Sequence, residues 1–576
     1  MPRFRCPFPL LTDIQSADGP GSFERPAFVV LCAALLAPVI AHGLWRPLVH
    51  ALGPGGNASA VTLAALAVSG TIAVAQGFCK RLTPLALLLL GGLVSVVATV
   101  GGSLGLPGLL TLLIVSVTSA FFLKELSARL PAALAGLAGR HKILCALYTL
   151  LALASVVKTA HLSIFMGDPS RVDRQVLPGE KFIETHSCLT AYVHADALGR
   201  SRVDNLYDER LWAGAEGIAA AAAKTENPYR PFLLDYFAYP PPFLLAMAPL
   251  APLSGDFAAQ RALWFGANGL LLAVGLWIVA RWLAGPGTHR VLLLAPIFFG
   301  SLPVLATLQI GNFQIAVVTL AVLAMVAFHS DRPALGGALL AFAILSKISP
   351  GILGIVLVAQ RRWRGVAWTA AFGVLLLALS VLTLGVNPLR AFLTYTIGRL
   401  SSGAAFGFLD DTAFNITTNL APFGLPFKLQ LIGLDVGDPW GLARRMGRIY
   451  TVALIALAAV ASRHTEDRRS QALTWLSLVV LAALQSPFAP AYVAIGLLWA
   501  ITLVATEVRG LGSGFFLIIL WLLLTVLPPV PDQAMLAILS VFRSLFTLAV
   551  PTWIIVRAAR HTASQSPTAQ PTAVGA

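Results

Sequence analysis

Apolar segments of helix length recur along all 576 residues of this chain. A helix needs roughly 20 apolar residues to cross a hydrocarbon core of about 30 Å. The residues are 57% hydrophobic and only 11% charged, whereas water-soluble domains carry about 25% charged residues. The pattern therefore predicts an all-α, polytopic membrane protein. The apolar runs lie near residues 27–44, 59–78, 82–100, 106–123, 143–165, 262–280, 291–308, 313–329, 334–346, 349–360, 365–385, 449–462, 472–484, 488–506, 513–529 and 533–557.

Several of these runs are too short to be complete spans. Irregular backbone at membrane depth is tolerated only where protein or a water-filled cavity covers it. We therefore expect one or two runs to form a broken or re-entrant element. The five cysteines are scattered singly, a distribution that predicts neither a disulfide framework nor a metal site.

The net charge of +15 does not indicate a nucleic-acid-binding protein, because nearly all basic residues lie in loops between apolar runs. Short cytoplasmic loops of membrane proteins are enriched in Lys and Arg. This rule predicts a multi-pass protein of the plasma (inner) membrane with both termini in the cytoplasm. Residues 1–26 are then a cytoplasmic segment and residues 561–576 a disordered tail. Two long loops, 166–261 and 386–448, face the extracytoplasmic side.

The first long loop contains a polar island, Gly167–Tyr239, which holds 11 of the 25 acidic residues: Asp168, Asp173, Glu180, Glu184, Asp196, Asp204, Asp208, Glu209, Glu216, Glu226 and Asp235. An ionisable group inside hydrocarbon costs roughly 2.5–3.5 kcal/mol on insertion scales. Such a loop beside the bilayer is therefore the expected place for a reaction. Ser187–Gly199 and Asp208–Lys224 have helical composition, and we expect both to lie along the membrane surface. Phe243–Leu253 is apolar but too short to span.

Four short motifs occur in order, and together they resemble those of family 87 glycosyltransferases. Tyr239-Pro-Pro-Pro242 resembles the Tyr-Pro-Pro signature, and Gly311-Asn-Phe-Gln314 resembles a Gly-Gln-x-Asn element. Lys347-Ile-Ser-Pro350, followed by the basic loop Arg361-Arg-Trp-Arg364, resembles a Lys-x-x-Pro element. Ser486-Pro-Phe-Ala-Pro-Ala-Tyr492 resembles a late Ser-Pro element. The likeness covers residues 143–506, which leaves the four-span region 27–142 as an accessory part and 507–560 as C-terminal spans.

This resemblance implies a GT-C-like helical bundle that transfers a hexose, with mannose as the first expectation, from a polyprenyl-phosphate sugar to a lipid or glycan acceptor. It implies no cofactor and no metal. Cys188 stands where the family has its catalytic aspartate, so a neighbour has to supply the base. The candidates are Glu184, which we favour, then His186 and Asp196.

Candidate substrate-binding residues are polar or aromatic groups in or beside these motifs and in the second long loop: Tyr192, Tyr239, Asn312, Gln314, Lys347, Asp410 and Asp411. The cations that could hold phosphate from the outer face are Lys347, Arg390, Arg399 and Arg444. Lys347 interrupts an apolar stretch, where an unpaired ammonium is costly.

Each candidate also has a structural explanation. Glu184 can be a solvated loop carboxylate and Lys347 can snorkel to the interface. Asn312 and Gln314 can hydrogen-bond neighbouring helices, and Tyr239 can shape its loop. Two other functions stay open: a transporter or lipid flippase, and a non-catalytic relative that binds polyprenyl lipid. A transporter should place its ionisable groups near the membrane midplane.

Overall fold

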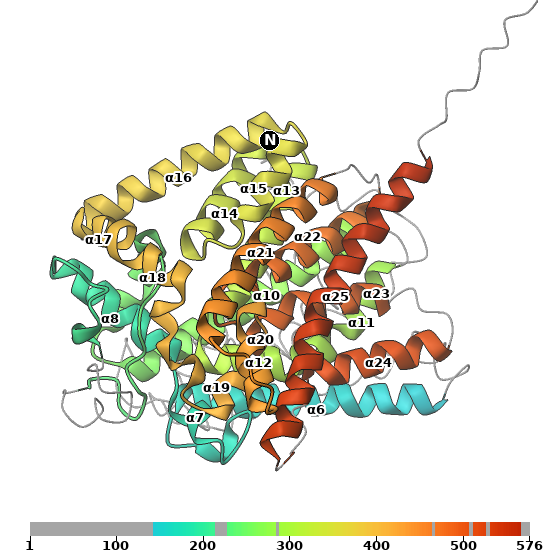
Figure 1. Ribbon diagram of the computed structural model, residues 1–576, viewed down its shortest axis with the longest axis horizontal. Helices are drawn as coiled ribbons and strands as arrows, with labels where there is room; N and C mark the ends of the chain where they lie inside the picture. Colours follow the sequence, from blue (N-terminus) through green and yellow to red (C-terminus); the bar gives the residue numbers. More distant parts are fainter. Residues whose placement is uncertain are drawn as a thin grey trace, which may run out of the picture. The chain divides into compact units, whose positions relative to one another are not determined.

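The computed structural model describes residues 142–212, 227–283, 287–462, 467–505, 511–525, 530 and 532–565. Within these ranges the regular structure is entirely helical, as expected, and contains no strand (Figure 1). The expected N-terminal segment and nearly all of the four-span region lie outside the described residues. The last helix, α25 (Gln533–Gln565), continues past His561, where the sequence predicts the start of a disordered tail.

The chain divides into two compact units. The described part of the first unit contains α6 (Lys142–Gly167), η5 (Val172–Arg174), most of α7 (Lys181–Thr185), the first part of α10 (Phe257–Leu283) and α11 (Gly287–Phe299). Helix α6 packs against α11. Arg261, buried on α10, donates a hydrogen bond from Nη1 to the carbonyl oxygen of Phe165 at 2.9 Å.

The second unit holds the remaining elements: α8 (Cys188–Arg200), η6 (Glu209–Leu211), most of η7 (Pro241–Leu253), α12 (Leu302–Ile310), α13 (Gln314–His329), α14 (Pro333–Ser346), α15 (Gly351–Ala359), α16 (Trp363–Leu384), α17 (Asn387–Ala391), η8 (Phe392–Thr396), α18 (Ile397–Ser402), η9 (Ala404–Asp410), α19 (Ala413–Thr418), η10 (Pro422–Gly424), α20 (Leu425–Leu431), α21 (Pro439–Ala461), α22 (Arg468–Ala483), η11 (Ala491–Ala494), α23 (Ile495–Ala505), α24 (Leu511–Thr525) and α25. Helix α14 packs between α13 and α16, and α22 packs against α23 and α25.

Four of the described helices are long and apolar enough to cross a membrane: Leu150–Gly167, Phe257–Leu283, Trp363–Leu384 and Gln533–Ala559. Helices α12 and α13 form a fifth candidate, bent by 112° at a short break. Gly311 opens this break with φ +71°, a left-handed conformation that glycine adopts without strain. The bent pair is the broken or re-entrant element that the short apolar runs predict.

The exposed surface of helix α16 is strongly apolar. Only 11% of its span is buried within the protein, and it exposes large side chains such as Val374 (67%) and Leu382 (76%). An outward apolar face of this extent is disfavoured in water and favoured in lipid. The several apolar helices therefore agree with a membrane protein.

The two long loops are more structured than their polar sequences suggest. Helix α8 confirms that most of Ser187–Gly199 is helical, whereas most of Asp208–Lys224 falls in 213–226, outside the described residues. The second loop contains several short helices, and α21 begins at Pro439, well before the apolar run at 449. Asp438 explains this early start, because its side chain accepts a hydrogen bond from the Gly441 N–H and caps the helix.

Candidate active site

The first part of the candidate site is the segment 233–235, which is hydrogen-bonded to residues at the start of α8 and just before it. The N–H of Leu233 donates to the carbonyl oxygen of Thr185 at 2.8 Å. The buried hydroxyl of Thr190 donates to the Leu233 carbonyl oxygen and accepts the N–H of Asp235, both at 3.0 Å. One threonine therefore holds the backbone of residues 233–235 beside the N-terminal turn of α8, which brings Asp235 next to Cys188 in space.

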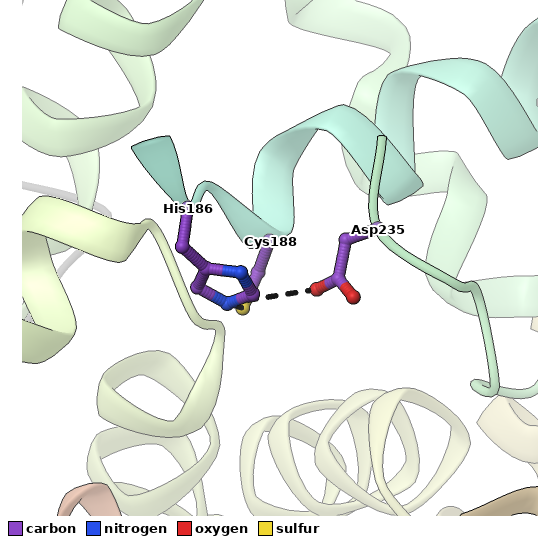
Figure 2. A group of neighbouring side chains, drawn as sticks. All are labelled: His186, Cys188 and Asp235. Carbon is purple, nitrogen blue, oxygen red and sulfur yellow. Dashed lines mark hydrogen bonds and ion pairs between the residues drawn. The ribbon is translucent and has the colours of Figure 1, made fainter. Parts of the chain in front are cut away.

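Three side chains with different chemistry meet there (Figure 2). His186 Nε2 lies 3.5 Å from Cys188 Sγ and 3.7 Å from Asp235 Oδ2. The three donor atoms all lie within 4.8 Å of one another. Cys188 is buried, and His186 and Asp235 are partly exposed. The same imidazole nitrogen faces both the thiol and the carboxylate. This differs from a catalytic triad, in which the acid and the nucleophile contact opposite nitrogens of the histidine.

The break between α12 and α13 supplies two amides to the same place. Asn312 Oδ1 accepts the N–H of Gln314 at 3.0 Å, a contact within the turn that precedes α13, whose N-cap residue is Phe313. Asn312 Nδ2 donates to Cys188 Sγ at 3.4 Å. The break between the apolar helices α12 and α13, where the chain bends by 112°, thus places the polar side chain of Asn312 beside the thiol of Cys188.

Lys347 adds a cation to these amides. It adopts an extended backbone conformation (φ −144°, ψ 125°) in the link between α14 and α15. Its Nζ donates to Asn312 Oδ1 and to Gln314 Oε1, both at 3.0 Å. The ammonium also lies 5.3 Å from the ring centroid of Tyr239 and 4.7 Å from that of Tyr492, contacts worth about 0.5–2 kcal/mol each. Among the described residues, no carboxylate forms an ion pair with Lys347.

Gln314 has a donor left without a partner. The residue is 2% exposed, and its Nε2 makes no hydrogen bond to any residue that the structure describes. Since Oε1 accepts from Lys347, the amide cannot be reversed without facing its NH₂ toward an ammonium, so Nε2 is the free end. A buried amide donor without a partner costs about 1–3 kcal/mol. An acceptor oxygen of a ligand would satisfy it.

Aromatic side chains surround the amides and the lysine. The hydroxyl of Tyr192 on α8 donates to the Tyr239 hydroxyl at 3.3 Å and accepts the N–H of Phe313 at 3.4 Å. Tyr207 Oη donates to the Tyr239 carbonyl oxygen at 2.8 Å. Tyr192 also makes edge-to-face contacts with Tyr239 and Phe243. These contacts fix the tyrosine of the Tyr-Pro-Pro motif against α8 and the helix break.

Burial controls the ionisation of the thiol and of the lysine. Burial raises the pKa of the Cys188 thiol, and the nearby Asp235 carboxylate raises it further, while Asn312 and Lys347 oppose the shift. Burial lowers the pKa of Lys347 to about 7. Cys188 is therefore a neutral thiol near neutral pH and cannot replace an aspartate as proton acceptor. The ionisable acid at this site is Asp235.

Residues 237–487 match the model of glycosyltransferase family 87. The chain carries a glycosyltransferase family 87 domain. This match confirms the resemblance drawn from the four motifs, and the apolar helices agree with a membrane glycosyltransferase. No curated protein and no solved structure matches the chain. Because the matched region begins at Phe237, it includes Tyr239 and Lys347, whereas His186, Cys188 and Asp235 precede it.

The structure brings together six of the residues predicted from sequence: His186, Tyr192, Tyr239, Asn312, Gln314 and Lys347. The family 87 domain provides the last four of them, and α8 with the residues just before it provides the other two.

The remaining predicted residues make none of these contacts. Glu184 is half-buried on α7 and belongs to the first unit. Asp196 pairs with Arg200 at 2.8 Å along α8. Asp410 accepts the Trp440 indole N–H at 2.9 Å, and Asp411 is exposed.

The other predicted phosphate-holding cations are not part of this group. Arg399 forms an ion pair with Glu209, and Arg390 and Arg444 are exposed.

Sequence reasoning missed Asp235 and Tyr492 as site residues. Both had a signal. Asp235 lies four positions before Tyr239, and Tyr492 ends the Ser-Pro element. Neither position shows by itself that the side chain faces Lys347 or His186, because those contacts join segments far apart in the chain.

Proposed function

We propose that this protein is a GT-C-type membrane glycosyltransferase that moves a hexose, mannose in the first instance, from a polyprenyl phosphate to a lipid or glycan acceptor. The reaction takes place at the extracytoplasmic face of the plasma (inner) membrane, with both termini in the cytoplasm and residues 143–506 as the catalytic core. The observation that carries the proposal is the position of Lys347, which lacks a described carboxylate partner beside the neutral amides of Asn312 and Gln314.

The proposed step is an inverting displacement. The acceptor hydroxyl oxygen attacks the anomeric carbon of the donor and forms the new glycosidic bond. The bond between that carbon and the phosphate oxygen breaks, and its electron pair leaves with the polyprenyl phosphate. The hydroxyl proton passes to a carboxylate, for which we assign Asp235 in place of Glu184. Proton transfer to a positioned base typically contributes about 10²–10⁴-fold to the rate.

Lys347 and Gln314 are suited to the leaving group. The ammonium lies beside the unpartnered Nε2 of Gln314, so one phosphate would receive both a charge and an amide donor. Donors aimed at developing negative charge are worth about 10²–10³-fold each. Tyr239 and Tyr492 flank the ammonium.

The test is transfer of radiolabelled mannose from synthetic polyprenyl-phosphate mannose in proteoliposomes that contain the purified protein and a lipid extract as acceptor source. A labelled glycolipid or glycan with release of polyprenyl phosphate supports the proposal. Label that crosses the bilayer without a new bond supports the transporter instead. Donor binding with neither outcome supports a non-catalytic relative. Parallel reactions with polyprenyl-phosphate glucose test the choice of hexose.

The lowered pKa of Lys347 predicts a pH dependence of donor binding. Because the pKa is about 7, raising the pH through that value removes the charge that would hold phosphate. The KM for donor should rise about tenfold between one unit below this pKa and one unit above it. Lys347→Arg stays charged throughout, so its KM should change little over the same range. A wild-type KM that is equally flat would contradict this role for Lys347.

A further inference from the structure

We propose that His186, Cys188 and Asp235 form a binding site for a divalent transition-metal ion such as Zn²⁺, with one coordination position left open. The three residues offer an imidazole nitrogen, a thiol sulfur and a carboxylate oxygen, all directed to one point (Figure 2). These are the ligand types that zinc prefers, and three protein ligands with one open position are typical of catalytic zinc sites.

The distances suit such an ion. Zinc bonds of about 2.3 Å to sulfur and about 2.0 Å to nitrogen, at a tetrahedral angle, place the two donors about 3.5 Å apart. Cys188 Sγ and His186 Nε2 are separated by 3.5 Å. The corresponding spacing between nitrogen and carboxylate oxygen is about 3.3 Å, against 3.7 Å between His186 and Asp235. The third pair, Cys188 Sγ and the Asp235 carboxylate oxygen, lies within 4.8 Å, so the Asp235 side chain would turn toward the sulfur to complete the site.

The backbone already holds the three donors in place. Thr190 fixes the Asp235 N–H and the Leu233 carbonyl beside α8, and Cys188 is the first residue of that helix. Asn312 donates to Cys188 Sγ, a contact that suits an anionic sulfur and would orient a thiolate ligand. Preorganised ligands with such neighbouring contacts are expected of metal sites.

A bound ion would also change the chemistry of the thiol. A coordinated thiol loses its proton outright, so metal binding should release a proton and become tighter as pH rises. The open position would accept an oxygen of the donor phosphate or of the acceptor. That assignment alone rests on the proposed function, whereas metal binding does not. A bound ion makes Asp235 a ligand, so proton acceptance by Asp235 belongs to the metal-free protein.

The experiment measures metal content without reference to transfer. The full-length protein is purified with a non-histidine tag, dialysed against Zn²⁺ or Co²⁺, and analysed by inductively coupled plasma mass spectrometry. We expect one ion per chain for wild type. Cys188→Ser, His186→Asn and Asp235→Asn should each lose most of it. Cys145→Ser and His194→Asn are the matched controls, because Cys145 lies on α6 and His194 faces Tyr229 and Trp212, and both should retain the ion.

The cobalt-loaded wild type gives a second readout that needs no variant. A tetrahedral Co²⁺ site with a thiolate ligand shows intense visible bands and a sulfur-to-cobalt charge-transfer band. Absence of that band, or substoichiometric metal in wild type, overturns the site and leaves Cys188, His186 and Asp235 as a hydrogen-bonded group only. Cys188→Asp should bind cobalt without the band. Adding polyprenyl phosphate should shift the visible bands; an unchanged spectrum overturns the open position but not the metal site.

Discussion

Asp235→Asn should lower the rate of sugar transfer by about 10²–10⁴-fold, the contribution typical of a general base. The substitution keeps the size of the side chain and removes its ability to accept the acceptor's proton. It should retain the contact from the Tyr236 N–H, which Asp235 Oδ1 accepts at 2.9 Å. The measurement is kcat and donor KM in proteoliposomes, where we expect the loss in kcat.

Glu184→Gln and Asp196→Asn are the natural comparisons, because both acids are candidates on sequence grounds alone. Asp196 is held by Arg200 along α8, and we expect its variant to transfer sugar within a few-fold of wild type. Full activity in Asp235→Asn together with a large loss in Glu184→Gln would move the base to Glu184 and refute our assignment. Metal content measured on the same samples separates loss of a ligand from loss of a base.

Lys347→Met should lower kcat/KM by about 10²–10³-fold, because the leaving phosphate loses its cation in a partly buried site. Methionine keeps the apolar stem, so the contacts with Tyr239 and Tyr492 suffer little. The substitution also removes the ammonium donor from Asn312 Oδ1, which keeps the Gln314 N–H, and from Gln314 Oε1. Folding is therefore checked by size-exclusion chromatography in detergent.

Two variants define what the lysine contributes. Lys347→Arg restores a charge but spreads it over a planar group, and it should recover part of the activity. Lys158→Met, at an exposed position on α6 in the other unit, removes an equal charge and should transfer sugar normally. Transfer by Lys347→Met at the wild-type rate would show that the ammonium only stabilises the helix link.

The local sequence predicts the positions of the helices of this protein well but predicts the contacts between them poorly. The run 365–385 predicts α16 almost to the residue, because periodicity and hydropathy reflect interactions within one helix. The run at 449–462 misses the first turns of α21, since the cap from Asp438 and the polar residues after it extend the helix beyond its apolar part. Short apolar runs indicate a broken element, but not that the break would carry Asn312 to Cys188.

The ranking of candidate bases shows the same limit. Glu184 is favoured in the sequence because it lies one helical turn before Cys188 if a single helix contains both. In the structure α7 ends at Thr185 and α8 starts at Cys188, so that premise fails and the spacing no longer supports the choice. The hydrogen bonds of Thr190 place Asp235 beside Cys188. The periodicity of the sequence does not predict these long-range contacts.

The sequence by itself determined that this is a helical membrane protein with the motifs of a family 87 glycosyltransferase, because apolar length and short motifs are local properties of the chain. Only the tertiary structure decided that His186, Cys188 and Asp235 meet, and that Lys347 reaches the amides at the α12–α13 break. Those contacts join segments separated by tens to more than a hundred residues. They depend on a bend and on a few buried hydrogen bonds, and both arise only when the helices pack.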